Sequence, residues 1–407
     1  MDRTILHCDC NSFYASVETL LDPTLAEGPA AVCGDPESRH GIILAKNEKA
    51  KAFGVQTAET IWQAQRKCPD LRLVAPHREE YVKYSRRCNE LYLQYTDLVD
   101  PFGIDESFLD VTGSLHLFGT GEHIADELRR RMREEVGLTI SVGVSFNRAF
   151  AKLGSDYKKP DGTTVFSREN FRERVWPLPA NTLLYVGKSA NDRLNRLGVH
   201  TIGELAACET AFMHHVFGKN GDMLLRYARG EDDEPVRSFY AEREVKSVGN
   251  SMTFAHNLVG EDECRMGLTA LCDNVGRRLR KRGMVCQTVQ LGIRDPEFRN
   301  RSRQVTLERP TNATRALIDT SMELLCAHWD LTQPVRLLSV TTANLLPEDQ
   351  SCEQLSLFDG AEDMQRRERQ QKLDKTVDAL RERFGKQSVV FAYLMKKEDQ
   401  KDDDTPF

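Results

Sequence analysis

The first half of the chain alternates short apolar runs with stretches whose apolar residues recur every three to four positions. Residues 4–10 form an apolar run that predicts a buried strand ending near Asp9. Phe13, Val17 and Leu20 then follow at helical spacing and predict a helix that stops before Pro23. The later elements are predicted in the order helix (78–95), hairpin around a Pro-Phe-Gly bend (98–112), helix (120–137) and strand (138–144). This order is typical of an antiparallel α+β sheet of ferredoxin-like type with helices on one face, interrupted by an insertion at 24–75.

The pattern changes after this sheet. Residues 171–234 predict short helices separated by glycines, and 183–207, which include Gly187 and Lys188, predict a helical hairpin. Such a hairpin can present backbone N–H groups to a phosphate, although an ordinary helical hairpin has the same pattern. Residues 243–345 predict a second α+β unit. After a polar stretch, the last predicted helix (362–384) has four apolar residues on one face: Leu373, Val377, Leu380 and Phe384.

Composition excludes several classes of protein. No run approaches the roughly 18 apolar residues of a membrane span, and the Met-Asp-Arg start lacks the apolar stretch of a signal peptide. The 11 cysteines are scattered without a CxxC pair, so we expect neither a disulfide framework nor a zinc site. We therefore expect a protein of the reducing cytoplasm, without contact to a membrane. We also expect a monomer.

The net charge of −6 counts at first against nucleic acid, because phosphate binding usually leaves a basic footprint. The charge is uneven, however. Residues 238–346 contain 15 basic and 12 acidic side chains, a balance of +3, while residues 1–237 and 347–407 are acidic. Eight basic residues gather in the positive segment: Arg277, Arg278, Arg280, Lys281, Arg282, Arg299, Arg301 and Arg303. They predict either a phosphate-binding surface or a solvated helix face.

Three carboxylates mark the candidate chemistry. Asp9 ends the first strand, and Asp105 and Glu106 follow the Pro-Phe-Gly bend at the start of another. Two neighbouring strands could bring them together, and hard cations such as Mg²⁺ bind carboxylate oxygens. In a regular strand Asp105 and Glu106 would face opposite sides, so both can serve one site only if the bend rotates one of them. The alternative is that these acids merely begin surface strands.

Three stretches closely resemble the signatures of Y-family translesion DNA polymerases, nearest to the DNA polymerase IV (DinB-like) group: LHCDCNSFYASVE (6–18), GIDESFLDVTGS (103–114) and SVGVSFNRAFAKLGSDYKKPDG (141–162). The resemblance extends over about residues 1–345. It implies a catalytic palm (1–23 and 76–166), inserted fingers (24–75), a small helical thumb with a helix-hairpin-helix (167–234), a linker (235–242), a separate α+β little finger (243–345) and a C-terminal tail (346–407). The implied activity is template-directed addition of deoxynucleotides to a primer 3′-hydroxyl in low-fidelity synthesis past damaged bases.

The resemblance also implies roles for single residues. Asp9, Asp105 and Glu106 match the ligands of two Mg²⁺ ions, which Mn²⁺ can replace, and the backbone carbonyl of Cys10 should complete one site. Tyr14 matches the steric gate that excludes a ribonucleotide's 2′-hydroxyl, although an aromatic there could also be plain core. Phe13 fits packing or a sugar contact, and Lys159 matches a triphosphate ligand. Backbone N–H groups of residues 11–14 suit the same phosphates.

The chain departs from the family pattern at 47–51, where many DNA polymerase IV members have Asn-Tyr-Glu-Ala-Arg and this chain has Asn-Glu-Lys-Ala-Lys. Lys51 keeps the positive charge of the arginine but loses its bidentate fork. Glu48 would repel phosphate, so we assign it no nucleotide contact. Lys49 either takes over the contact or is simply solvated. This stretch is closer to the UmuC-type subunit of polymerase V, which leaves a need for accessory subunits open.

The resemblance assigns partners as well. The basic residues of the little finger, with Gly187 and Lys188 of the thumb hairpin, would hold primer-template DNA. Gln354, Leu355, Leu357 and Phe358, within QLSLF in the polar tail, resemble the peptide that binds the bacterial sliding clamp. Two other classes of function are weighed against the polymerase. One is a non-catalytic factor that binds DNA and the clamp. The other is a different two-metal enzyme on a similar palm, such as a nucleotidyl cyclase.

Overall fold

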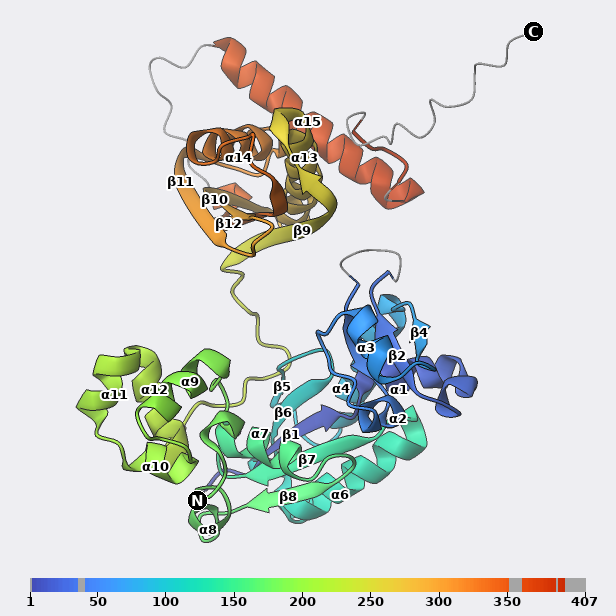
Figure 1. Cartoon of the computed structure of the whole chain (residues 1–407), viewed down its shortest axis with the longest axis vertical. Coiled ribbons are helices and arrows are strands. Elements are labelled where there is room, and N and C mark those ends of the chain that lie inside the picture. The colour runs from blue at the N-terminus through green and yellow to red at the C-terminus, as the bar shows by residue number, and fades with distance from the viewer. Residues whose placement is uncertain (1, 36–40, 351–360, 386, 392–407) are drawn as a thin grey trace. The chain divides into compact units, whose positions relative to one another are not determined.

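The computed structural model describes residues 2–35, 41–350, 361–385 and 387–391, and these form two compact units, 1–242 and 243–407 (Figure 1). The first unit contains twelve α-helices in its described part. They are α1 (Phe13–Leu21), α2 (Glu48–Ala52), α3 (Ile61–Lys67), α4 (Arg78–Tyr92), α5 (Leu115–Phe118), α6 (Gly121–Arg131), α7 (Arg148–Tyr157), α8 (Phe171–Arg174), α9 (Lys188–Arg196), α10 (Ile202–Ala207), α11 (Thr210–Phe217) and α12 (Lys219–Arg229). None of the described helices in either unit is long and apolar enough to cross a membrane.

A five-stranded sheet organises the first unit. Its order is β5-β6-β1-β7-β8, with bounds β5 (Val99–Pro101), β6 (Glu106–Asp110), β1 (Ile5–Cys10), β7 (Ile140–Ser145) and β8 (Thr163–Phe166). Strand β1 is central and pairs antiparallel with β6 and β7. The prediction of an α+β fold is confirmed, but β8 pairs parallel to β7, so the sheet is mixed rather than purely antiparallel.

Helices cover both faces of this sheet, where the sequence predicted one. Leu6 and Cys8 of β1 face a core shared with α1, α4 and α6, while Ile5 faces Ala151 of α7 on the other side. Helix α7 approaches β7 so closely that a Cβ on Gly143 would lie 1.9 Å from the carbonyl oxygen of Ala151. This close approach places the side chains of α7 beside those of β1 that point to the same face.

Two smaller parts complete the first unit. The insertion at 24–75 has its own three-stranded sheet in the order β3-β2-β4, with bounds β3 (Ile43–Lys46), β2 (Ala30–Cys33) and β4 (Arg72–Val74). Helices α8 to α12 pack around a core that also includes Phe146, Phe150 and Phe166. Both were predicted as separate segments along the chain.

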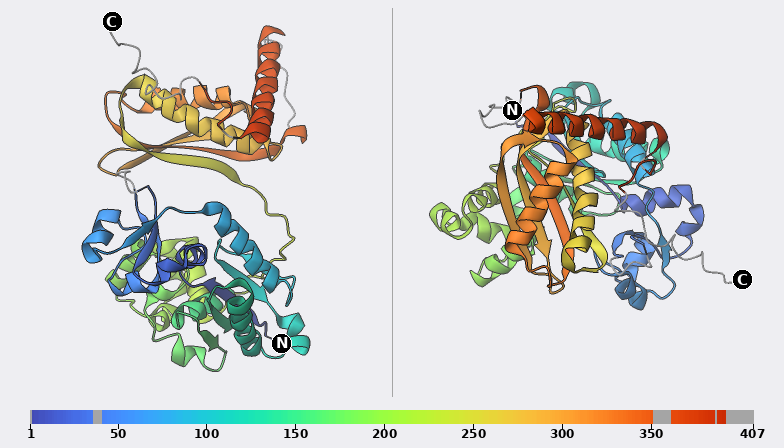
Figure 2. Two further views of the ribbon diagram at one scale, coloured as in Figure 1. Left: turned by 90° about the vertical axis from the view of Figure 1, so that its right-hand side faces the viewer. Right: turned by 90° about the horizontal axis from the view of Figure 1, so that it is seen from above.

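The second unit is a four-stranded antiparallel sheet with helices on one face (Figure 2). Its strand order is β11-β10-β12-β9, with bounds β11 (Asn300–Thr311), β10 (Met284–Arg294), β12 (Val335–Pro347) and β9 (Ser247–Leu258). Helices α13 (Gly260–Arg280) and α14 (Thr314–His328) share the core with Val289, Leu338 and Val340. The other face of the sheet is not covered by these helices.

The last helix, α15 (Ala361–Phe384), docks on the second unit through its polar face. Arg280 of α13 is 5% exposed and lies 2.6 Å from Asp378 and 3.2 Å from Asp374. Asp374 also accepts the backbone N–H of Thr314, which begins α14. The apolar stripe predicted from the sequence points elsewhere, since Leu373 is 54% exposed and Phe384 62%. Buried ion pairs, rather than apolar packing, therefore fix this helix.

Candidate active site

The three carboxylates come together where β1 and β6 lie side by side. Asp9 pairs in register with Glu106 across the two strands. Asp105 lies in the bend just before β6, and its carbonyl accepts the backbone N–H of Cys10 at 2.9 Å. Because Asp105 is outside the regular strand, it is not forced to the face opposite Glu106, which was the geometric obstacle seen in the sequence.

All three carboxylates line one cavity of about 470 Å³. The wall also includes Cys10, Phe13, Tyr14 and Lys159 from the sheet and its connections. The insertion contributes Lys46, Glu48 and Lys51. All eight residues assigned to metal and nucleotide from the sequence thus line the same cavity.

Two lysines balance the negative charge. Lys152 of α7 lies 2.7 Å from Glu106 and 3.1 Å from Asp9, and Lys159 lies 2.9 Å from Asp9. Burial alone would lower the pKa of both ammonium groups, but Asp9 and Asp156 reverse this and raise the pKa of each above its ordinary value. Both lysines therefore stay charged at neutral pH.

The two neighbouring acids differ in pKa. Burial favours the neutral form of Glu106, but the adjacent His7 ring and the charge and hydrogen bond of Lys152 outweigh it and hold the pKa at about 2. Burial raises the pKa of Asp105, and the charges of Asp9 and Glu106 raise it further. Asp105 thus carries negative charge that its surroundings do not fully balance.

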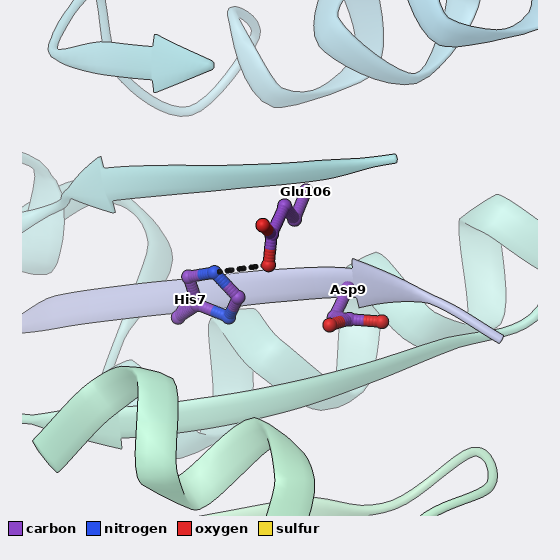
Figure 3. Close-up of side chains that lie close together, drawn as sticks. All are labelled: His7, Asp9 and Glu106. Carbon is purple, nitrogen blue, oxygen red and sulfur yellow. Dashed lines mark ion pairs between the residues drawn. The ribbon is translucent and has the colours of Figure 1, made fainter. Parts of the chain in front are cut away.

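This charge distribution fits a divalent cation. Asp9, Asp105 and Glu106 supply only oxygen donors, which Mg²⁺ prefers, and a cation beside Asp105 would relieve the repulsion that raises its pKa. His7, Asp9 and Glu106 also form the group of potential ligands whose atoms all lie within 4.8 Å of one another (Figure 3).

His7 is better suited to position Glu106 than to bind metal itself. It is fully buried on β1, its Nε2 atom lies 3.3 Å from Glu106, and its Nδ1 atom lies 2.8 Å from the Ser155 hydroxyl. Burial lowers its pKa, so the imidazole is neutral at physiological pH. The ring, held on its other side by Ser155, lies against Glu106 and limits where that carboxylate can point.

Tyr14 is held as a rigid part of the cavity wall. Its ring stacks on Tyr81 of α4 with centroids 4.3 Å apart and an angle of 17°. The Tyr81 hydroxyl donates to Glu18, which also binds His77, so the supporting ring is itself anchored. Phe13 is 3% exposed and belongs to the core, which agrees with the packing role considered for it.

The residues at 48–51, where the sequence departs from the family pattern, differ in whether they reach the cavity. Lys51 and Glu48 line the cavity and lie 3.5 Å apart. Lys49 does not line it, and its ammonium group donates to the Glu27 carbonyl at 2.8 Å. Of the N–H groups at residues 11–14, that of Asn11 is already bonded to the Thr139 carbonyl. The N–H groups of Phe13 and Tyr14, in the first turn of α1, have no partner within the helix.

Sequence reasoning missed three site residues: His7, Lys46 and Lys152. Lys152 was inside the quoted signature, one helical turn before Asp156 on α7, and Asp156 pairs with both Lys152 and Lys159, the latter just after the helix. Lys46 was one residue before the altered stretch, and His7 lay two residues before Asp9 on the same strand face. In each case spacing relative to a recognised residue was the available signal.

The structure changes the picture for the basic residues. Gly187 and Lys188 are exposed at the start of α9. In the second unit, Lys281 and Arg282 are exposed, while Arg277 is partly buried. Several of the arginines have intramolecular partners. Arg278 donates to the Gly249 carbonyl, Arg299 pairs with Asp295, and Arg301 lies over the Trp329 ring. Arg282 and Arg303 each donate to a nearby backbone carbonyl. Arg303 is exposed on β11.

Arg280 is a correction. Its side chain is 5% exposed, and its guanidinium is bound by Asp374 and Asp378 of α15. A buried arginine that already has two carboxylate partners is not available to a DNA phosphate. The sequence could not show this, because both partners lie more than 90 residues further along the chain.

The uncovered face of the second sheet carries small polar residues instead. Strand register places Ser251, Ser339, Gly292 and Ser302 in one row across the four strands. They line a shallow cavity of about 360 Å³, with Arg294 and Asn300 beside them. A flat surface of hydroxyl groups, bordered by positive charge, can approach a phosphate backbone without steric hindrance. Gln354, Leu355, Leu357 and Phe358 lie outside the described residues.

Comparisons with known proteins agree with this geometry. Residues 8–156 match the impB/mucB/samB family, and residues 245–357 match the C-terminal domain of that family. The chain is 45% identical to DNA polymerase IV of Acetivibrio thermocellus over 97% of this chain and 98% of that protein. It is 36% identical to DNA polymerase IV 1 of Bacillus subtilis over 100% of this chain and 96% of that protein.

The fold has a solved counterpart as well. A Y-family DNA polymerase chimera superposes with a TM-score of 0.75 at 23% identity, covering 84% of this chain and 99% of the other. Sequence and fold therefore lead to the same family. The chain belongs to the impB/mucB/samB family, that is, to the Y-family DNA polymerases, in its DNA polymerase IV group.

Proposed function

We propose that this chain is a template-directed DNA polymerase that extends a primer 3′-hydroxyl with deoxynucleotides and continues past damaged template bases. The observation that carries the proposal is the cavity in which Asp9, Asp105 and Glu106 meet Tyr14 and Lys159. The family and the full-length identity to DNA polymerase IV relatives support it. The ten cysteines that the structure describes are free thiols, in keeping with a cytoplasmic location, and we propose a monomer.

The parts of the chain have separate tasks in this proposal. The palm (1–23 and 76–166) carries the carboxylates, the fingers (24–75) close the nucleotide cavity, and the thumb (167–234) contacts DNA through its hairpin. After the linker (235–242), the little finger (243–345) holds the duplex, and the tail (346–407) binds the clamp. The division of the chain into two compact units after residue 242 supports a linker that ends there.

Asp9, Asp105, Glu106 and the Cys10 carbonyl would hold two Mg²⁺ ions, or Mn²⁺ in their place. When bound, the ions make the primer hydroxyl a better nucleophile and neutralise the triphosphate. His7 and Lys152 position Glu106, and Lys159, with the free N–H groups of α1, binds phosphate oxygens. The Tyr14 ring narrows the space beside the sugar.

Primer extension tests the proposal. The purified full-length chain, without accessory subunits, is incubated with Mg²⁺, the four deoxynucleotides and primed templates with or without one defined lesion. Extension on both templates is expected. Extension that needs added partner subunits would favour the UmuC-type alternative, and DNA binding without any extension would favour the non-catalytic factor. Cyclic nucleotide formation from a triphosphate would indicate the cyclase.

The open sheet face of the second unit predicts an electrostatic effect on DNA binding. Ser302→Glu puts a negative charge in the hydroxyl row and is expected to weaken primer-template binding about tenfold at low salt, because the carboxylate repels phosphates. The difference should shrink as salt rises. Fluorescence anisotropy of labelled duplex measures both. Ala327→Glu, an exposed position on α14 over the other face, adds the same charge and is the matched control. Equal weakening by both variants would place the DNA elsewhere.

The tail predicts an effect on processivity. Leu357→Ala with Phe358→Ala removes the apolar side chains that would fill a pocket on the sliding clamp. Clamp-stimulated synthesis on a long primed template should fall to the level seen without clamp, while single-nucleotide insertion stays as in the wild type. Gel analysis of product length with and without clamp measures this. Stimulation that persists in the double variant would show that the clamp binds another segment.

A further inference from the structure

Glu48 is placed where a negative side chain is least expected. It begins α2 and lines the same cavity as Lys46, Lys51 and Lys159. Its carboxylate lies 3.5 Å from the Lys51 ammonium and accepts a hydrogen bond of 3.3 Å from the Ser12 hydroxyl. A single carboxylate thus bridges the insertion and the residue just before α1.

The groups that Glu48 binds are suited to phosphate. Lys51 supplies a positive charge, and Ser12 precedes the first turn of α1, where backbone N–H groups without helical partners favour an anion. Carboxylate and phosphate oxygens accept the same charge-assisted hydrogen bonds. Glu48 therefore satisfies, from within the chain, donors that a nucleotide triphosphate could use.

Local stability gives little reason for this carboxylate. Asn47 already caps α2 by accepting the Ala50 N–H at 2.9 Å. The pair of Glu48 with Lys51 is about half exposed, at 51% and 53%, and exposed pairs of this kind contribute little to folding. We therefore relate Glu48 to the binding of ligands in the cavity and not to the stability of α2.

Lys46 is a second positive charge near the Glu48 carboxylate. Its ammonium group donates to the Thr57 hydroxyl at 3.0 Å, within the cavity wall. Burial lowers the pKa of Lys46, and the nearby charge of Lys51 lowers it further, whereas Glu48 and Glu59 act in the opposite direction. The two lysines repel each other, and Glu48 reduces that repulsion while no nucleotide is bound.

We propose that Glu48 is an internal substitute for a phosphate group. It occupies Lys51 and the Ser12 hydroxyl in the nucleotide-free protein and is displaced by the incoming triphosphate. Glu48 therefore sets the affinity for nucleotide without taking part in the chemical step. The inference rests on the proposed polymerase function and deepens it, since it assigns a role in nucleotide affinity to Glu48.

Steady-state kinetics of single-nucleotide insertion tests the proposal. Glu48→Gln keeps the size of the side chain and its ability to accept from Ser12 but removes the charge. KM for the deoxynucleotide should fall about five- to tenfold, because the triphosphate no longer competes with a carboxylate for Lys51 and is no longer repelled by it. The kcat should change little. Glu48→Asp keeps the charge and should retain most of the wild-type KM.

A second readout separates the triphosphate from the base and sugar. Inorganic tripolyphosphate, used as a competitive inhibitor, should inhibit Glu48→Gln at a concentration lower by a similar factor. Glu27→Gln removes one exposed carboxylate of the same insertion that does not line the cavity, and it should leave KM unaltered.

The outcomes are distinct. An unchanged or higher KM in Glu48→Gln, with wild-type extension intact, overturns the inference but not the polymerase. A higher KM would mean that Glu48 assists nucleotide binding, for instance through a cation. Absence of extension by the wild type would overturn the proposed function itself.

Discussion

Replacing Asp105 and Glu106 together with alanine is expected to lower primer extension by at least about 1,000-fold, because metal-ion stabilisation of charge supplies several kcal/mol to such reactions. The fold should survive the change. Lys152 keeps Asp9 and Asp156 as partners, so no buried ammonium is left without a carboxylate. The double variant also removes the mutual repulsion among Asp9, Asp105 and Glu106, which in the wild type contributes to the raised pKa of Asp105.

Two measurements check this prediction. Single-turnover insertion gives the rate, and thermal unfolding with increasing Mg²⁺ gives binding of the ion independently of activity. The melting temperature of the wild type should rise with Mg²⁺, and that of the double variant should not. Asp126→Ala with Glu127→Ala removes the same dipeptide pair from α6, outside the cavity, and should behave as the wild type. Comparable extension by the Asp105/Glu106 variant would refute the assignment of the site.

The second large effect concerns Tyr14. Tyr14→Ala should raise ribonucleotide incorporation relative to deoxynucleotide incorporation by about 100-fold, because the ring no longer clashes with the 2′-hydroxyl. The stacking of Tyr14 on the anchored Tyr81 explains why the ring cannot simply move aside. Steric exclusion works only when the excluding group is held in place.

The ratio of kcat/KM for a ribonucleotide and its deoxynucleotide measures the discrimination. Tyr14→Phe retains the ring and loses only the hydroxyl, so it should keep the wild-type preference. Deoxynucleotide insertion by Tyr14→Ala should fall by less than about tenfold, since the ring touches no reacting atom in this proposal. An unchanged sugar preference in Tyr14→Ala would place the gate at another residue.

Local pattern predicted those features that depend on neighbours in the chain. The strand at 4–10, the helix after it and the bend before Glu106 follow from short-range signals, and with them the meeting of Asp9 and Glu106. The doubt about Asp105 was resolvable only in three dimensions, because it depended on where β6 begins.

Features fixed by distant partners were not predictable. Helix α7 packs closely on β7 at Gly143 and covers the second face of the sheet. The spacing of apolar residues in the sequence does not predict which face this helix covers. In the sequence Arg280 is indistinguishable from the other members of the basic run, and only the structure shows its acidic partners in α15. The apolar stripe that includes Leu373 and Phe384 left open what the last helix packs on, and the structure docks the helix through ion pairs while this stripe stays largely exposed.

The docking of α15 has a consequence for how the protein is made. Arg280 and its partner Asp378 are 98 residues apart in the chain. At a synthesis rate of roughly 5–20 residues per second, the carboxylate leaves the ribosome roughly 5–20 s after the arginine. During that interval α13 and α14 can assemble on their sheet, but α14 still lacks the acceptor that Asp374 gives to its first N–H group. The second unit is thus completed only when its C-terminal helix has been synthesised. A chain truncated before α15 would contain Arg280 without its two carboxylate partners.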